Sequence, residues 1–504
     1  MASKTLTEIL LVDFRWIVVV LFLLPASFLY NLFYSVRSKI IFKLHSAPRS
    51  HDAKVAGIQK QVRKWKESGA KIKMCTARPG WQTMSFRKPM YKKTSYQINC
   101  NLVDVLDVDT KRKVVRVEPL VSMGQLSETL APLGWTIPIV PELDDLTVGG
   151  LVMGTGVESS SHIYGLFQHI CLSYELVLAD GSVVKCSENE NSDLFYAVPW
   201  SYGTLGLLTA VEIMIIPATK YIRLHYEPVV GLQNVVDKFE SACRDTKKNK
   251  YVEGLLYTLD EAVIMTGEMV EDSEVEPDKV NDISKWYKPW FFVHVRDILK
   301  KREKTYEYVP LREYYHRHSR ALFWEIQDIV PFGNNIIFRY LFGWLLPVKV
   351  SLLKLTQTET VKKLYENNHI IQDLLVPTST MKKCCEEFDR LVNVYPVWLC
   401  PFLLPNNPGM LQPAKGMTSD LYVDIGVYGV PKGRRFHPVE TTRAVEDLVE
   451  QSKGFQMLYA DTYRTREEFR RMFDHGLYDK MRKKYSCEGA FPEVYDKVNK
   501  NVRD

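Results

Sequence analysis

Several patterns that mark common protein classes are missing from this chain of 504 residues. It has no Cys-x-x-Cys pair and no cysteine–histidine cluster, so neither a zinc site nor any other metal site is predicted. No Asn-x-Ser/Thr site for N-glycosylation occurs, and the nine cysteines are odd in number and irregularly spaced. Both facts favour a body that faces a reducing compartment.

A strong excess of one charge is also missing. The net charge is +6, from 66 Lys and Arg against 60 Asp and Glu. No basic block of the kind that follows a phosphate backbone occurs, so nucleic acid is not an expected partner, whereas attraction to anionic lipid is compatible with the charge. The length predicts two folded domains and an appended segment.

One long apolar run lies near the N-terminus. Residues 16–36 carry no charge, and as a helix they reach roughly 30 Å, enough to cross a bilayer core. The run is long for a cleaved signal peptide and lacks the amphipathic face of a buried soluble helix. We therefore predict a single transmembrane anchor at 14–36. The positive-inside rule places the following body in the cytosol, because basic residues gather after the run, at Arg37, Lys39, Lys43 and Arg49.

The remaining sequence predicts mixed helices and strands. Apolar residues recur at helical spacing over 55–65 and predict an amphipathic helix that ends near Gly69. Short β-like runs follow, including a strand at 114–117 and a hairpin at 175–184. A second mixed region extends over about 226–453, before a charged helical end.

The main functional signal is a stretch rich in small residues, from Thr147 to Ser161. Small residues let backbone amides approach a pyrophosphate closely, and threonine and serine hydroxyls add donors. Arg78-Pro79-Gly80-Trp81 lies upstream and predicts a second phosphate-binding turn. No strand is followed by a G-x-G-x-x-G that opens a helix, so a separate nicotinamide domain of the Rossmann type is not expected.

Three further motifs follow in order: Leu178-Ala179-Asp180-Gly181, Asp193-Leu194-Phe195 and Gly203-Thr204-Leu205-Gly206. Together with the two glycine loops they resemble the FAD-binding domain of the vanillyl-alcohol oxidase and p-cresol methylhydroxylase family. Many members of this family tether FAD through a His in the upstream turn, and some through a Cys in the small-residue loop. Both residues are missing here, so the resemblance implies non-covalent FAD.

The resemblance implies an α+β fold with a two-subdomain FAD-binding domain at 50–226. It also implies an α+β cap domain for the substrate at 227–450 and a C-terminal segment at 451–504 that returns to the flavin. The implied FAD-binding residues are Arg78, Pro79, Gly80, Trp81, Thr147, Gly149, Gly150, Thr155, Gly156, Val157, Glu158, Ser159, Ser160, Ser161, His162, Ile163, Tyr164, Gly165, Leu166, Phe167 and Gly203.

Longer motifs narrow the resemblance to membrane-bound members of the family that reduce the delta(24) side-chain double bond of sterols in sterol biosynthesis. They are Phe195–Trp200, Tyr315–His318, Phe323–Asp328, Pro331–Asn335 and Phe491–Lys497. This resemblance implies NADPH as co-substrate, a sterol taken from the bilayer, contact with membrane lipid, and the endoplasmic reticulum membrane, or alternatively the Golgi membrane, as location.

The sequence leaves the proton donor and one apolar segment open. Tyr459 and Asp461 lie in the C-terminal segment and are the predicted catalytic residues, with Glu325 and His316 as rivals. The run Ile329–Val348 is interpreted either as a buried core helix or as an interfacial element.

Two other functions also remain open. One is an oxidase or dehydrogenase of the same family that acts on an alcohol or a sugar lactone. The other is a membrane protein that binds a sterol without turnover. Retained glycine loops argue against this second alternative, because a dead flavin site has no need of them.

Overall fold

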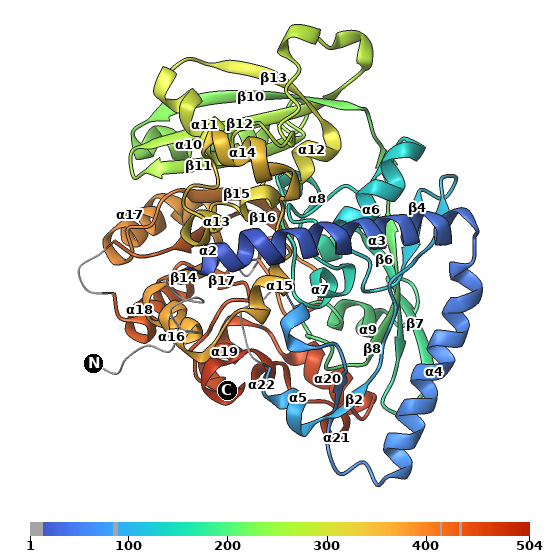
Figure 1. The fold of residues 1–504 in the computed structure, drawn as a ribbon. Helices are drawn as coiled ribbons and strands as arrows, with labels where there is room; N and C mark the ends of the chain where they lie inside the picture. Colours follow the sequence, from blue (N-terminus) through green and yellow to red (C-terminus); the bar gives the residue numbers. More distant parts are fainter. Residues whose placement is uncertain (1–13, 84–88, 414–415, 433–435, 504) are drawn as a thin grey trace.

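The computed structural model describes residues 14–83, 89–413, 416–432 and 436–503. In this part of the chain, two large antiparallel sheets lie beside each other, with helices around them and a long N-terminal helix across the front of the molecule (Figure 1). The predicted mixed helix-and-sheet class is confirmed.

The smaller sheet has five antiparallel strands in the order β3-β4-β8-β6-β7. The predicted strand at 114–117 is β4, and the predicted hairpin is formed by β6 and β7, where Val177 pairs with Val183. Most valines and leucines on these strands are buried, with Leu172 and Val183 as exposed exceptions. The strands are β3 Val105–Asp109, β4 Val114–Val117, β6 Cys171–Val177, β7 Val183–Ser187 and β8 Leu207–Met214.

The larger sheet has eight antiparallel strands in the order β13-β10-β12-β11-β15-β16-β14-β17. The predicted boundary between 226 and 227 lies inside its strand β10, and the segment predicted to begin at 451 enters it as edge strand β17. The strands are β10 Tyr221–Val230, β11 Tyr251–Thr258, β12 Glu261–Val270, β13 Thr305–Pro310, β14 Ile370–Pro377, β15 Val397–Pro405, β16 Ser419–Gly429 and β17 Phe455–Gln456.

Three amphipathic helices share one core with the larger sheet: α10 (Leu232–Arg244), α17 (Met381–Leu391) and α18 (Pro438–Gln451). Their apolar residues recur every three or four positions and meet in this core, which is why the helices lie on the sheet. Other helices are α6 Met123–Leu130, α9 Ser192–Ala197, α11 Phe291–Lys301, α12 Leu311–Tyr315, α13 Ile326–Ile329, α15 Val350–Leu355 and α16 Glu359–Asn368.

Short elements complete the chain. Strands β1 (Met74–Thr76) and β2 (Tyr96–Ile98) pair in parallel, and β5 (Trp135–Thr136) pairs with β9 (Ile216–Pro217). The C-terminal segment is helical, as its composition predicts. It contains α19 Arg466–Met472, α20 Gly476–Lys484, α21 Cys487–Ala490, α22 Val494–Val498 and α23 Lys500–Arg503.

The N-terminal helix is continuous from Arg15 to Lys43 and contains an 18-residue stretch with a mean hydropathy of 2.1, which makes it a candidate membrane span. It consists of α2 (Arg15–Val18), a π-helical turn (Val19–Leu23) and α3 (Leu24–Lys43). The π turn lies just before Pro25, whose missing N–H removes one helical hydrogen bond. Helix α4 (Ala47–Glu67) follows and buries the apolar positions within 55–65, which confirms the amphipathic helix.

The apolar run 329–348 is not a buried core helix. It contains α14 (Ile336–Phe342) and a 3-10 turn at Gly343–Leu345. Only Phe338 of α14 is buried, and the side chain of Ile337 is 67% exposed. The helix is short because Gly343 ends it, and its apolar side chains face outward.

Candidate functional site

The two loops predicted to hold phosphate lie next to each other. Arg78 leads into a 3-10 turn at Gly80–Gln82, and Thr147 precedes helix α7 (Val148–Met153). The Arg78 Nη1 group donates a hydrogen bond of 3.5 Å to the Thr147 Oγ1 atom. Arg78, Trp81 and Thr147 line a cavity of about 640 Å³, a volume typical of ligand sites.

The glycines of the second loop have different roles. A Cβ atom on Gly149 would lie 2.7 Å from a proline side chain, and one on Gly156 would lie 2.8 Å from Leu151 Cδ2. Both positions need glycine because the chain packs against itself there. Gly150 is exposed, and a Cβ on it would meet only the Thr147 hydroxyl, at 3.2 Å. The backbone of Gly150 is therefore open to a ligand.

Two further predicted residues, one in this loop and one outside it, have no protein group against their hydroxyl or open side. The Thr155 hydroxyl is buried without a hydrogen-bond partner in the part of the chain that the structure describes. Gly203 has a φ angle of +67°, and a Cβ on it would meet nothing within 4 Å. An orphaned hydroxyl and an open glycine are both expected where a ligand binds.

The stretch from Glu158 to Phe167 contacts the larger sheet and its helices. The Ser159 hydroxyl accepts a hydrogen bond of 2.9 Å from Tyr314, and His162 Nε2 lies 3.0 Å from the Asn249 carbonyl oxygen. These side chains therefore bind protein. The same stretch holds helix α8 (Ser161–Tyr164) and further residues that are buried or half-buried: Val157, Glu158, Ser160, Ile163, Gly165, Leu166 and Phe167.

Three cationic side chains surround the upstream turn, Arg78, Lys92 and Lys354, and a fourth, Lys497, lies near Lys92 and over the Tyr91 ring. Lys92 Nζ donates to the Arg78 carbonyl at 2.5 Å, and Lys354 Nζ donates to the Gly80 carbonyl at 2.8 Å. Burial lowers the pKa of Lys354 to about 7 and that of Lys497 to about 8. The pKa values of Arg78 and Lys92 are also lowered, again mainly by burial. One buried and three half-buried cations gathered in this region favour a bound anion.

This donor set fits the pyrophosphate of FAD. A dianion needs cations, backbone approach and hydroxyl donors, and the structure offers the four cations together with Gly150 and Thr155 of the small-residue loop. The C-terminal segment reaches one of the predicted FAD-binding positions, because Lys497 Nζ donates to the Tyr202 carbonyl, next to Gly203. The sequence reasoning missed Lys92, Lys354 and Lys497, since nothing in their local pattern distinguishes them from surface lysines.

A buried ion pair joins the small-residue loop to the larger sheet. The Arg317 guanidinium lies 2.7 Å from Glu158 and 2.6 Å from Glu253, and all three side chains are fully buried. Burial disfavours the charged form of Glu253, but Arg317 outweighs it and holds the pKa of that carboxyl below its usual range. The tie fixes the position of the loop relative to the sheet.

A second cluster holds acids and phenols. Asp373 on β14 accepts hydrogen bonds from the hydroxyls of Tyr428 and Tyr459. Burial raises the pKa of Asp373 to about 6 and that of Glu142 to about 8. Asp424 is completely buried, with neither carboxyl oxygen hydrogen-bonded among the described residues, and burial raises its pKa well above the usual range. Clustered carboxyls with raised pKa values are typical of a site for proton transfer.

Glycine also shapes this cluster. A Cβ on Gly426 would lie 2.4 Å from the Tyr428 hydroxyl oxygen and 3.0 Å from Asp373 Oδ1. Because Gly426 has no side chain, the Tyr428 side chain can pass over it on strand β16 and reach Asp373 on strand β14. Glu142 connects the cluster to the small-residue loop, because the charges of Glu158 and Asp373 both raise the pKa of its carboxyl.

The structure separates the four predicted proton donors. Tyr459 belongs to the cluster of Asp373, whereas the Asp461 carboxylate forms an ion pair with Lys500 at 3.3 Å. His316 Nε2 lies 2.8 Å from the Ser127 hydroxyl, and Glu325 lies beside His369, 3.0 Å from its Nε2. Only Tyr459 of the four contacts the paired acid and phenol groups that are suited to proton transfer.

Asp373, Asp424 and Glu142 were missed by the sequence reasoning. No motif connects them, because they come from separate strands and loops that only the fold brings together. One signal was present: Asp373 and Asp424 interrupt the strongly apolar runs 370–377 and 421–428. An acid in the middle of a buried strand is rare without a specific role.

Comparisons with known proteins agree with this geometry. Residues 54–187 match the family model described as FAD binding domain. Delta(24)-sterol reductase from Mus musculus is 59% identical over 98% of this chain and 95% of its own length. The protein of that name from Arabidopsis thaliana is 40% identical over 97% and 92%. L-gulonolactone oxidase from Mus musculus is 30% identical over only 32% of this chain and 35% of its own length.

The sterol reductases match nearly the whole chain, whereas the oxidase matches only one part of it. The oxidase covers only a third of the chain, whereas the sterol reductases cover both large sheets and the C-terminal segment. The chain is therefore a flavin-type oxidoreductase, and it belongs to the delta(24)-sterol reductase family.

Proposed function

We propose that this protein reduces the delta(24) side-chain double bond of sterols, as in the conversion of desmosterol to cholesterol, with FAD as cofactor and NADPH as donor. The observation that carries the proposal is its 59% identity over nearly full length to proteins named delta(24)-sterol reductase. The fit of the cationic loops to pyrophosphate and the buried Asp373 cluster support it.

FAD would be held without a covalent bond by the two glycine loops. Arg78, Lys92, Lys354 and Lys497 would neutralise the pyrophosphate, and the open backbone at Gly150 would approach it. FAD, when bound and reduced, supplies the hydride of this reaction. Because a bound dianion favours the charged form of each neighbouring amine, the pKa values of Lys354 and Lys497 would rise on binding.

An isolated alkene needs an acid, because no carbonyl polarises it. A proton added at carbon 24 places positive charge on the tertiary carbon 25, which then accepts the hydride. Asp373 and Tyr459 are suited to deliver that proton. When Asp373 is protonated, it donates to the Tyr459 oxygen, and the phenol hydrogen is released for another acceptor. The carboxylate left after transfer then stabilises the positive charge.

This assignment gives a direction for the pH dependence. The active form carries a proton on Asp373, whose pKa is raised to about 6 by burial. Turnover should therefore fall as the pH rises through about 6. The Tyr428 hydroxyl donates a hydrogen bond to the other carboxyl oxygen of Asp373, the one that Tyr459 does not bind, and Tyr428 acts as a positioning residue.

The substrate and location follow from the same proposal. A sterol is nearly insoluble in water, so we propose that it comes from the bilayer and that the protein contacts membrane lipid. The proposed location is the endoplasmic reticulum membrane, with the body on the cytosolic side. Support comes from the apolar helix Arg15–Lys43 and the basic residues near its C-terminal end.

The test uses the full-length protein purified in a mild detergent with desmosterol. Protein reduced chemically and freed of reductant should convert one desmosterol per flavin without NADPH, and NADPH should sustain further turnover. Tyr459→Phe should still be reduced by NADPH but should lose at least about 100-fold in product formation. Tyr196→Phe is the matched control, since its hydroxyl contacts an exposed glutamate.

Two results contradict the proposed reaction, and a third contradicts only the proposed proton path. Oxidation of a sugar lactone or alcohol with release of hydrogen peroxide favours the oxidase alternative. Desmosterol binding without flavin reduction or product favours a non-catalytic sterol-binding protein. Normal turnover by Tyr459→Phe removes Tyr459 and Asp373 from the proton path while leaving the overall reaction intact.

A further inference from the structure

The N-terminal helix lies along the folded body instead of projecting from it (Figure 1). Val19, Val20, Leu24 and Ser27 on its inner side are buried. The Ser27 hydroxyl accepts a hydrogen bond of 2.9 Å from the backbone N–H of Lys349. The contact therefore includes directional bonds as well as apolar packing.

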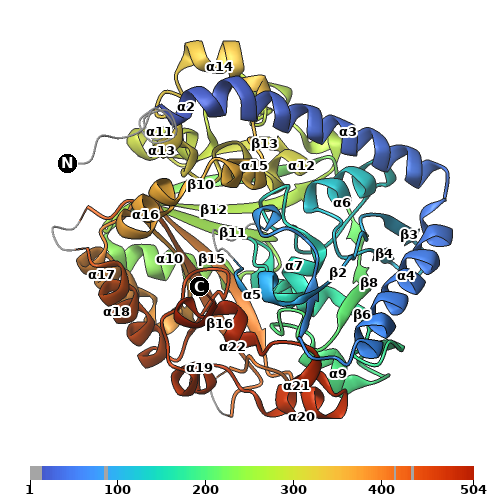
Figure 2. The same ribbon diagram turned by 60° about the horizontal axis from the view of Figure 1, so that its bottom comes forward.

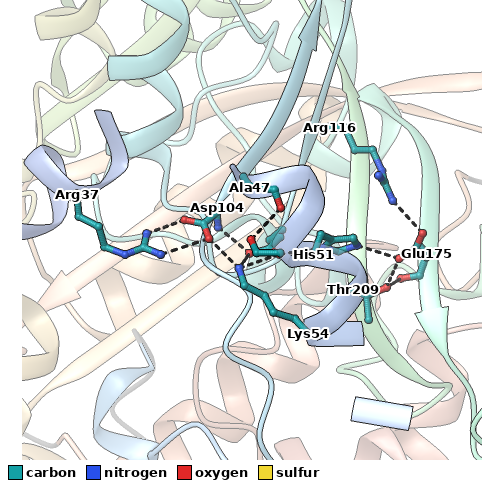
Figure 3. A network of polar contacts seen from close by, with 10 residues as sticks. Arg37, Ala47, His51, Lys54, Asp104, Arg116, Glu175 and Thr209 are labelled. Carbon is teal, nitrogen blue, oxygen red and sulfur yellow. Dashed lines mark hydrogen bonds and ion pairs between the residues drawn. The ribbon is translucent and has the colours of Figure 1, made fainter. Parts of the chain in front are cut away.

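Both ends of the helix are fastened to the same body. At its start, Arg15 is only 6% exposed and donates to the Leu353 carbonyl at 3.2 Å. Near its other end, Arg37 binds the buried Asp104 carboxylate at 2.6 Å, and Lys54 binds the same carboxylate at 2.7 Å (Figure 3). Arg15 and Arg37 lie roughly 33 Å apart along the helix axis.

This separation is incompatible with a membrane span. A spanning helix places residues some 30 Å apart on opposite sides of the hydrocarbon core. Leu353 and Asp104, the two partners, belong to one folded body, which occupies one side of a membrane. If the contacts of Arg15 and Arg37 with the body are both kept, the helix must lie parallel to the bilayer surface.

The outer side of the helix is mainly apolar, with one exposed cation, Lys39, near its end. Its apolar side chains that are about half exposed or more recur at intervals of three, four or seven positions, so they lie on one face. The most exposed are Phe22 at 65%, Phe33 at 64% and Leu29 at 63%. The face consists of Leu21, Phe22, Leu29, Leu32, Phe33, Val36 and Ile40.

Helix α14 adds more exposed apolar side chains next to this face. It lies beside the N-terminal helix on the outside of the molecule (Figure 2), where Trp344 contacts Phe28 and Phe332 contacts Trp16, with ring centroids 5.4 and 5.0 Å apart. The exposed residues of α14 and of the 3-10 turn that follows it are Ile336, Ile337, Tyr340, Leu341 and Trp344. These residues and the outer face of the N-terminal helix are together called the apolar surface.

The border of the apolar surface has the chemistry of a lipid headgroup region. Trp286 and Tyr287 are exposed beside α14, with the Trp286 and Tyr340 rings 5.1 Å apart. Exposed lysines lie nearby, at Lys285 next to these rings and at Lys43 at the end of the helix. Tryptophan and tyrosine rings prefer the bilayer interface, and lysines attract anionic lipid.

We propose that the apolar surface lies in one leaflet of the bilayer, so that the N-terminal helix runs in the membrane plane and the entire chain stays on one side. The proposal rests on the membrane location in the proposed function. The occupant is the acyl and headgroup region of a single leaflet, and the predicted single-pass arrangement is the competing outcome.

Topology distinguishes the two arrangements. Full-length protein would carry one epitope tag before Met1 and another after Asp504, in sealed microsomes treated with protease. We expect both tags to be digested without detergent. Digestion of the C-terminal tag with full protection of the N-terminal tag would overturn the proposal, because the helix would then cross the bilayer.

Surface variants give a second readout. The double variant Ile337→Glu and Leu341→Glu changes two exposed side chains of α14 and should weaken binding to vesicles of phosphatidylcholine and phosphatidylserine on the order of tenfold. Val230→Glu is the matched control, because Val230 is 48% exposed on strand β10. Unchanged vesicle binding by the double variant would contradict a role for α14.

Activity separates this inference from the proposed function. In detergent, the double variant should reduce desmosterol at the normal rate, and with vesicle-embedded desmosterol it should be slower. If the unchanged protein lacks activity in detergent, the proposed function fails. If activity is normal and the two tags lie on opposite sides, only the in-plane arrangement fails.

Discussion

Replacing Asp373 by asparagine tests the buried proton site directly. In the folded protein the pKa of Asp373 is raised from its ordinary value of 3.8 to about 6, with burial as the main cause. A group with a raised pKa binds more protons in the folded than in the unfolded state. Its contribution is favourable at low pH and is lost as the pH rises through about 6.

The size of this effect follows from the two pKa values. Above pH 7, the shift from 3.8 to about 6 costs about 3 kcal/mol of folding free energy. At pH 5 about half of that cost is already present, so the change between pH 5 and pH 8 is about 1.4 kcal/mol. Asparagine does not titrate, and Asp373→Asn should therefore become more stable relative to the unchanged protein by this amount over that range.

The assay is urea unfolding of both proteins at several pH values in the same detergent. The difference between the two proteins reports Asp373 together with Glu142 and Asp424, whose raised pKa values depend in part on the Asp373 charge. Product formation provides the second measurement: asparagine has no acidic proton to give, so the variant should retain FAD and lose at least about 100-fold in turnover below pH 6, where Asp373 is protonated in the unchanged protein. A stability difference that does not change with pH would refute the raised pKa, and normal turnover would refute the proton path.

Three further outcomes are expected. Acid or heat should release all the flavin as FAD, and flavin that stays with precipitated protein would contradict non-covalent binding. Gly150→Glu should lower FAD affinity more than tenfold without loss of folding, measured by flavin fluorescence, whereas Gly156→Glu should lower the melting temperature, because its Cβ would press on Leu151. Lys497→Met should weaken FAD binding about tenfold while thermal stability is retained, and unchanged affinity would remove Lys497 from the site.

The sequence was informative wherever a local pattern decides the structure. The strand Val114–Val117, the hairpin at 175–184 and helix α4 were predicted because alternation and helical spacing report burial directly. Arg78 and Thr147 were placed in two loops of one site because their motifs occur in a recognisable order.

Other features depend on contacts that no local pattern contains. Asp373 meets Tyr428 and Tyr459 only after strands far apart in sequence have paired. The run Ile329–Val348 has the composition of a core helix, but whether its side chains are exposed depends on which of them other segments of the chain cover. The apolar helix Arg15–Lys43 satisfies the length and hydropathy of a span, and only its fastenings at Arg15 and Arg37 show how it lies.

The N-terminal helix has one more consequence, because its other side forms a wall of the cavity at the candidate flavin site. Phe28, Tyr34 and Ser35 line that cavity together with Arg78 and Thr147. With the apolar surface in a leaflet, one helix diameter of roughly 10 Å separates the lipid from the cavity. A sterol then reaches the site by lateral diffusion, and the rate of reduction should follow the mole fraction of sterol in the membrane instead of its concentration per volume of solution.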